Sequence, residues 1–157
     1  MFVYSVRAST VKFFSVIILT LLLLVGVLIF SPFPEVAVYA ASGKIEFDGM
    51  KTNDDRVNFI KGFGYEIDEI PIEEVAFSMP ENFDRIIAGY NEIQKSQGLD
   101  LSKYKNKKVT RYTYNVKNYE GYDGAVVVNL IICRGTVVAC DISSLDAGGF
   151  ILPLVKL

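Results

Sequence analysis

The chain has 157 residues, of which 16 are Lys or Arg and 18 are Asp or Glu, so its formal net charge is −2. This length fits a single folded domain with short appendages. The chain has no histidine, which excludes nucleophilic sites that use an imidazole base and most zinc sites. Hydrophobic residues are concentrated at the start, and the remainder has the composition of an ordinary soluble domain.

Residues 13–30, FFSVIILTLLLLVGVLIF, form an uncharged apolar run. As an α-helix such a run is about 27 Å long, which matches the hydrocarbon core of a bilayer. Arg7 and Lys12 precede it, and the next base is Lys44. This distribution predicts a single-pass transmembrane helix, a signal anchor in the cell membrane, with residues 1–12 in the cytoplasm and the C-terminal part outside. A second interpretation is a signal peptide cleaved after Ala40, which would make the protein secreted.

Pro32 and Pro34 end this helix, so residues 31–44 are expected to be a tether. Residues 45–157 then form the extracytoplasmic domain. A short strand is expected at residues 45–47. A helix should begin at Thr52, because Asp55 stands three residues later as in a capping box.

Two short strands are expected next, at residues 65–67 and 75–79. A second helix should begin near residues 80–82 and end near Lys95, before Gly98. Its apolar residues recur every three or four positions and predict one core-facing side. They are Phe83, Ile86, Ile87, Tyr90 and Ile93.

Three strands are expected after this helix, at residues 109–117, 125–133 and 136–143. Arg134-Gly135 suits a two-residue hairpin between the last two. The strand at 125–133 is apolar on both sides apart from Asn129, which is typical of a central strand covered on both faces. The predicted fold class is α+β: an N-terminal transmembrane helix, then a small two-helix, mostly antiparallel-sheet domain that ends in a three-strand meander, in the order β-α-β-β-α-β-β-β.

Cys133 and Cys140 are the only cysteines. In a regular hairpin around Arg134-Gly135, both side chains would lie on one face, about 13 Å apart along the strands. That separation exceeds the Cα distance of a disulfide, so two buried free thiols are expected.

Carboxylates are the remaining route to acid–base catalysis, and Asp141 is the best single candidate. In the expected hairpin it lies opposite Val128 among apolar residues, where burial would raise its pKa. The alternative is a half-buried aspartate bonded to the backbone or to a nearby hydroxyl. The acidic clusters elsewhere in the domain are typical of solvated surface.

Charge is unevenly distributed along the outer domain. Residues 35–94 carry 13 acids and 5 bases, whereas residues 95–157 carry 5 acids and 9 bases. Bases alternate with tyrosines in the second part, which indicates a surface for an acidic protein or an anionic envelope polymer. The candidate residues are Tyr104, Lys105, Lys107, Lys108, Arg111, Tyr112 and Tyr114. Under the simpler alternative, the tyrosines fill the sheet core and the lysines solvate a loop.

A distinctive set of residues begins in the C-terminal part of the second predicted helix and continues after it: YNEIQ at 90–94, QGLDL at 97–101, Tyr104, Lys107, RYTY at 111–114 and Asn118-Tyr119. In these residues the sequence resembles a family of short membrane-anchored proteins from clostridial-type Gram-positive bacteria, the domain of unknown function 4830 family. The similarity covers most of residues 52–152. This chain has Asn106 and Ala139 at positions where the family has glycine. Because the family has no established activity, the resemblance transfers no catalytic residue.

The sequence thus predicts a membrane-anchored extracytoplasmic binding domain of unknown ligand, without a recognisable catalytic set. The expected partners are the lipid bilayer, through residues 13–30, and a protein or anionic envelope polymer. No cofactor, metal or nucleic-acid partner is expected. The alternative function is a cell-envelope enzyme that depends on carboxylates alone.

Overall fold

The computed structural model describes residues 45–155. The predicted cytoplasmic segment, transmembrane helix and tether, residues 1–12, 13–30 and 31–44, lie outside this part of the chain. Among residues 45–155, no helix combines the length and apolar character needed to cross a membrane. The described elements are α2 (Asn53–Lys61), β1 (Glu73–Ser78), α3 (Arg85–Lys95), the 3-10 helix η2 (Leu101–Tyr104), β2 (Lys108–Asn115), β3 (Val126–Cys133), β4 (Thr136–Ser144) and β5 (Ile151–Pro153).

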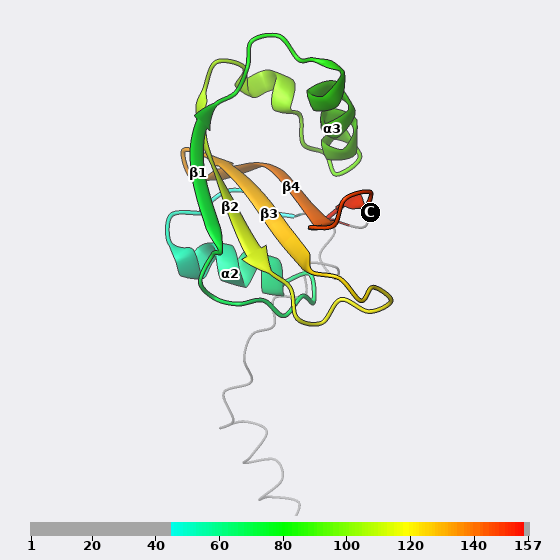
Figure 1. Ribbon diagram of the computed structural model, residues 1–157. Helices are drawn as coiled ribbons and strands as arrows, with labels where there is room; N and C mark the ends of the chain where they lie inside the picture. Colours follow the sequence, from blue (N-terminus) through cyan, green and yellow to red (C-terminus); the bar gives the residue numbers. More distant parts are fainter. Residues whose placement is uncertain (1–44, 156–157) are drawn as a thin grey trace, which may run out of the picture. The chain divides into compact units, whose positions relative to one another are not determined.

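The five strands form one antiparallel sheet in the order β1-β2-β3-β4-β5, with α2 on one face and α3 with η2 on the other (Figure 1). This arrangement confirms the predicted α+β class. β3 lies at the centre of the sheet and is buried along nearly its whole length, as its two apolar sides predicted.

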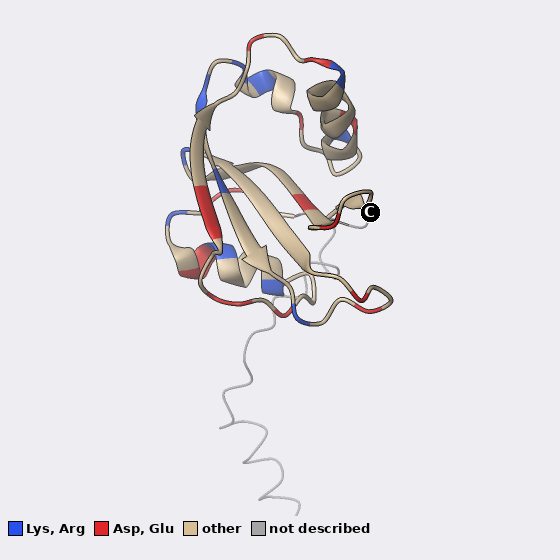
Figure 2. Cartoon of the chain, in the orientation of Figure 1, with Lys and Arg blue, Asp and Glu red and all other residues tan. Residues whose placement is uncertain are grey.

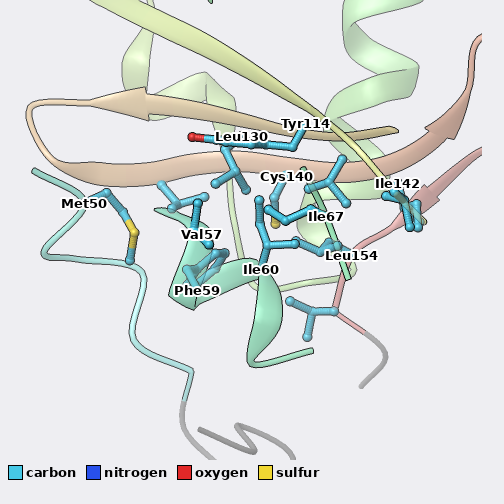
Figure 3. Packing of buried hydrophobic residues seen from close by; sticks show 14 of the residues in the cluster. Met50, Val57, Phe59, Ile60, Ile67, Tyr114, Leu130, Cys140, Ile142 and Leu154 are labelled. Carbon is cyan, nitrogen blue, oxygen red and sulfur yellow. The ribbon is translucent and has the colours of Figure 1, made fainter. Parts of the chain in front are cut away.

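The larger core lies between the sheet and α2 (Figure 3). Side chains of α2, among them Phe59 and Ile60, pack against alternate residues of β3 such as Leu130. Local sequence explains α2, because Thr52 and Asp55 form the predicted capping box: Asp55 N–H donates to Thr52 Oγ1 and Thr52 N–H donates to Asp55 Oδ2.

A smaller core lies on the opposite face, under α3 and η2. Leu101, Val109 and Ile131 belong to it, with Tyr104 at its margin. The expected apolar side of α3 is not its most buried side, because Ile86 is 81 % exposed while Asn91 and Gln94 are buried. The apolar spacing predicted the helix correctly but not its rotation, since polar contacts to the sheet determine which side of α3 faces inward.

Several predicted boundaries were wrong. Residues 45–47 form no strand, and of residues 65–67 only Ile67 makes a β-bridge, to Val116. α3 begins at Arg85, because Asp84 accepts the Ile87 N–H as its N-cap. The predicted meander is β2–β3–β4, but the short strand β5 follows it, so the meander does not end the domain.

The β3–β4 hairpin turns at Arg134-Gly135 as predicted, and both residues have positive φ, 51° and 83°. The register then shifts between Ile131 and Ile132, because β4 contains one extra residue there. Asp141 consequently lies opposite Asn129 and not opposite Val128.

The same bulge corrects the expected positions of the cysteines. Both are free and buried, as predicted. However, Cys133 belongs to the small core and Cys140 to the large one, so they lie on opposite faces of the sheet rather than on one.

Candidate functional site: the basic end of the sheet

Five exposed bases gather where β2 begins and the β3–β4 hairpin turns, and we call this group the basic end. It consists of Lys103, Lys105, Lys107, Lys108 and Arg134. Figure 2 shows the blue segments around η2, the start of β2 and the hairpin. Cys133 Sγ donates to the backbone carbonyl of Lys108 at 3.6 Å. Arg134 follows Cys133 directly, so the hairpin turn lies beside the start of β2.

The loop that carries the lysines is held firmly to α3. Asp100 caps η2 by accepting from Ser102 N–H at 3.0 Å and Ser102 Oγ at 2.7 Å, and Asn91 Nδ2 donates to the same oxygen at 3.2 Å. These hydrogen bonds lower the pKa of Asp100 to about 2. Asn91 Oδ1 also accepts from Leu101 N–H at 2.7 Å. The lysines therefore project from a fixed backbone.

The loop then turns sharply into β2 at Asn106. Asn106 has a φ of 60°, and its N–H donates to Met79 O at 2.9 Å, while Met79 N–H donates to Lys107 O at 2.9 Å. Asparagine tolerates this left-handed conformation better than most residues, and glycine tolerates it best. The residue at this position must therefore adopt a positive φ.

Two of the lysines lie over aromatic rings. Lys107 Nζ is 5.0 Å from the centroid of the Tyr104 ring, and Lys105 Nζ is 5.3 Å from that of Phe83. Ring faces attract cations at these distances. Such contacts restrict the ammonium groups without neutralising them, so their charge remains available to an anionic ligand.

Four bases elsewhere in the described part of the domain have carboxylate partners, whereas the exposed bases Lys51 and Arg85 have none within 4.0 Å. Lys61, Lys95, Arg111 and Lys117 pair with carboxylates at 2.6 to 2.8 Å. Within residues 45–155, by contrast, none of the five bases of the basic end has a carboxylate within 4.0 Å. Of the seven exposed bases without a carboxylate partner in the described part, five therefore lie at one end of the sheet.

The structure separates the remaining candidate surface residues from the basic end. Arg111 lies within β2, on the α3 face, where it pairs with Glu73 at 2.7 Å. Tyr112 and Tyr114 point to the other face, and Tyr114 is fully buried. The expectation of one surface built from all seven residues was wrong, because alternate residues of a strand point to opposite faces.

Both tyrosines instead hold a buried arginine that the sequence analysis missed. Arg56 of α2 lies 3.8 Å from the centroid of the Tyr112 ring, and its Nε donates to Tyr114 Oη at 2.9 Å. Tyr114 Oη in turn donates to Asn53 Oδ1 at 3.0 Å. Burial raises the pKa of Tyr114, so its hydroxyl stays protonated and links α2 to the sheet.

Asp141 lies in β4 on the α3 face and is buried. Tyr90 Oη donates to its Oδ1 at 2.6 Å, and Asn129 Nδ2 donates to its Oδ2 at 2.9 Å. Burial raises the pKa of Asp141, although these hydrogen bonds oppose the shift, and burial also raises the pKa of Tyr90. Because both carboxylate oxygens are engaged, the geometry is that of a group that fastens α3 to the sheet.

A surface depression of about 470 Å³ lies at the opposite end, lined by Lys61, Tyr65, Ile67 and Lys117 among others. Both lysines are ion-paired, with Glu69 and Asp68. Within the described residues no three His, Cys, Asp or Glu side chains are grouped to hold a metal ion.

The sequence pattern of the domain of unknown function DUF4830 matches residues 59–142, which is more than half of the chain. The chain belongs to the DUF4830 family. No curated protein and no solved structure matches it significantly. The matched range runs from within α2 to β4 and therefore includes α3, η2 and the lysines at 103–108.

The residues on which the resemblance to DUF4830 rests are chiefly structural in this chain. Gln94 Oε1 accepts from Cys140 N–H at 2.9 Å, and Gln97 Nε2 donates to Cys140 O at 2.9 Å. Gln97 Oε1 also accepts from Val155 N–H at 2.9 Å. The two glutamine amides thus bind the backbone of Cys140, which lies just before the residues of β4 that pair with β5. The sequence did not predict this role, since the only signal in it was the place of both glutamines in the family motif.

Proposed function

We propose that this DUF4830 protein binds a phosphate-bearing anionic polymer of the cell envelope through its basic end. The supporting observation is the concentration of unpaired bases there: in the described part, seven exposed bases have no carboxylate partner, and five of them belong to the basic end. The other two are Lys51 and Arg85. Clustered charge of one sign raises the local concentration of an oppositely charged ligand.

The chemistry of the basic end favours a polymer over a folded acidic protein. Four of its five bases are lysines, whose ammonium groups are mobile point charges without the fixed fork of an arginine. Protein interfaces usually depend on aromatic or arginine anchors in desolvated pockets. Exposed lysines on a short loop can bind repeated phosphate groups, because that binding depends on opposite charge more than on a complementary shape.

The proposal includes the cellular arrangement that the N-terminal sequence predicts, with residues 13–30 as a membrane anchor and the DUF4830 domain outside. Cell fractionation with an antibody against the domain tests it. We expect the full-length chain in carbonate-washed membranes, and loss of the domain when protease is added to intact protoplasts. A shortened soluble form outside the cells would contradict the anchor and support cleavage after Ala40.

Binding is tested by titrating the detergent-solubilised full chain into fluorescently labelled poly(glycerol phosphate). The double variant Lys105→Gln/Lys107→Gln removes two charges from the basic end. A lysine near a strongly anionic surface contributes about 1 kcal/mol, so affinity should fall about 30-fold. Raising the salt concentration from about 0.1 M to 0.5 M should weaken wild-type binding as well.

The matched control is Lys61→Gln/Lys117→Gln, which changes the net charge equally but at the opposite, ion-paired end. This control should alter affinity no more than about twofold. Equal losses in both double variants would show a response to net charge alone and contradict the proposal. Binding of poly-glutamate in preference to poly(glycerol phosphate) would assign the basic end to an acidic protein instead.

A further inference from the structure

The two edges of the sheet differ in how completely they are covered. Along β4, the backbone pairs with Phe47 at Val137, with the amides of Gln94 and Gln97 at Cys140, and with β5 beyond that. At the other edge, β1 pairs with β2 on one side, and no described residue pairs with its other side. All residues of β1 except Val75 are exposed. An uncovered strand edge of this length is a template for another strand.

We propose that two copies of this chain associate by antiparallel pairing of their β1 strands, which joins the two sheets into one. β1 has few of the devices that block such pairing. Its only charged residues are Glu73 and Glu74 at its start, it contains neither lysine nor proline, and it runs for six residues, whereas β5 has only three and includes Pro153.

The β1–β2 register determines which backbone groups are available. Met79, the residue after β1, donates its N–H to Lys107 O. The odd-numbered residues of β1 therefore direct their backbone N–H and C=O groups toward β2. Because these groups alternate along a strand, Glu74, Ala76 and Ser78 direct theirs outward. A symmetric antiparallel pair can use all three residues only if Ala76 lies opposite Ala76 of the second copy.

This register is also favourable for the side chains. Glu74 lies opposite Ser78 of the second copy, and Val75 lies opposite Phe77, which is 36 % exposed in the single chain. Apolar pairs across strands stabilise a sheet. The pairing would therefore cover apolar surface and place no two like charges opposite each other.

Charge selects the antiparallel orientation. Glu73 and Glu74 begin β1, and Ser78 at its end is paired with Lys108 of β2. In the antiparallel dimer, Glu74 of each copy lies near Lys108 of the other, on the same face of the sheet. A parallel pair would instead bring the glutamates of both copies together, which is unfavourable. Of the basic end, only Lys108 takes part, so the proposal does not depend on polymer binding.

A charge exchange tests the register with the full chain in detergent micelles, with self-association measured by sedimentation equilibrium. Glu74→Lys and Lys108→Glu should each weaken dimerisation about 5- to 10-fold, and the double variant should restore it to within about twofold of wild type. Rescue by the double variant cannot result from misfolding. A monomeric wild type, or a double variant that is as weak as the single ones, would overturn the proposal.

Cross-linking tests the symmetry independently. Ala76→Cys should form a disulfide-linked dimer under mild oxidation, because the two cysteines face each other at about 5.5 Å between Cα atoms. The matched control is Leu152→Cys, an exposed position on the opposite edge strand β5. The native cysteines are buried and should contribute little background. Equal cross-linking at both positions would show non-specific association through another part of the chain and overturn the proposal.

Discussion

The polar side chains between α3 and the sheet form hydrogen bonds within the domain, whereas the lysines of the basic end form no ion pairs with described residues. Tyr90, Asn91, Gln94 and Gln97 all form hydrogen bonds within the domain, and three of them are buried. The lysines are exposed and, among the described residues, have no carboxylate partner. Polar residues near one another in sequence therefore differ in structural role: those on α3 attach the helix to the sheet, whereas the lysines form no ion pair within the described part of the chain.

The largest loss of stability should come from Gln94→Leu, because Gln94 connects α3 to the backbone of β4. The variant removes the acceptor for Cys140 N–H and leaves that buried donor unsatisfied, at a cost of about 1–3 kcal/mol in the free energy of unfolding. Urea denaturation of the full chain in detergent, followed by tyrosine fluorescence, measures this change. An unchanged midpoint would show that the amide contributes nothing to the attachment of α3.

Tyr90→Phe should have a smaller effect. It removes the hydroxyl that donates to Asp141 Oδ1 at 2.6 Å but leaves the Asn129 contact and the ring in place. A hydrogen bond to a charged group typically contributes about 1.5–3 kcal/mol. We expect a loss at the lower end of this range, about 1.5 kcal/mol, because the Asn129 contact to the carboxylate remains. Hydrogen exchange of the α3 amides provides a second measurement, because looser attachment of α3 should accelerate it. Protection equal to wild type would contradict the role given to Tyr90.

The two aspartates near α3 should respond to pH with opposite signs. The folded-state pKa of Asp141 is raised above 3.8, mainly by burial, so the folded protein binds this proton more tightly than the unfolded chain. Its contribution to stability is present below pH 3.8 and is lost as pH rises through the folded-state pKa. The pKa of Asp100 is lowered to about 2, mainly by hydrogen bonds from Ser102, so its contribution is present above 3.8 and is lost as pH falls toward 2.

Unfolding free energies of wild type, Asp141→Asn and Asp100→Asn between about pH 3 and 6 test this contrast. As pH falls, the advantage of wild type over Asp141→Asn should grow, and its advantage over Asp100→Asn should shrink. Slopes of the same sign in both comparisons would contradict the assigned pKa directions.

The smallest effect on stability should come from the basic end itself. Lys105→Gln/Lys107→Gln removes two exposed charges that repel their neighbours and only weak contacts to the Phe83 and Tyr104 rings. Surface substitutions of this kind usually change stability by less than about 0.5 kcal/mol. A clearly larger loss in urea denaturation would assign the lysines a structural role.

Local sequence signals predicted the elements that depend on neighbouring residues. The capping box at Thr52 and Asp55 and the Arg134-Gly135 hairpin are formed as expected, and β3 is central because it is apolar on both sides. The helix at 85–95 was also predicted, although its N-cap Asp84 was not. In each of these cases the signal lies within a few residues of the feature.

The features that the sequence did not predict depend on distant contacts. The bulge in β4 sets Asp141 opposite Asn129, and no local pattern marks an extra residue in a strand. Gln94 faces inward because its partner is the backbone of Cys140, 46 residues away. The seven candidate surface residues do not lie on one surface for a similar reason: strand alternation places Arg111 and Tyr112, which are neighbours in sequence, on opposite faces of the sheet.

We propose that the lysines bind the ligand, whereas the α3 contacts stabilise the fold. Titration of labelled poly(glycerol phosphate) with wild type, Tyr90→Phe and Lys105→Gln/Lys107→Gln, under conditions in which all three are folded, separates these two roles. We expect wild-type affinity for Tyr90→Phe and an affinity about 30-fold weaker for the lysine variant. Wild-type affinity in the lysine variant, or an equal loss in both variants, would contradict this proposal.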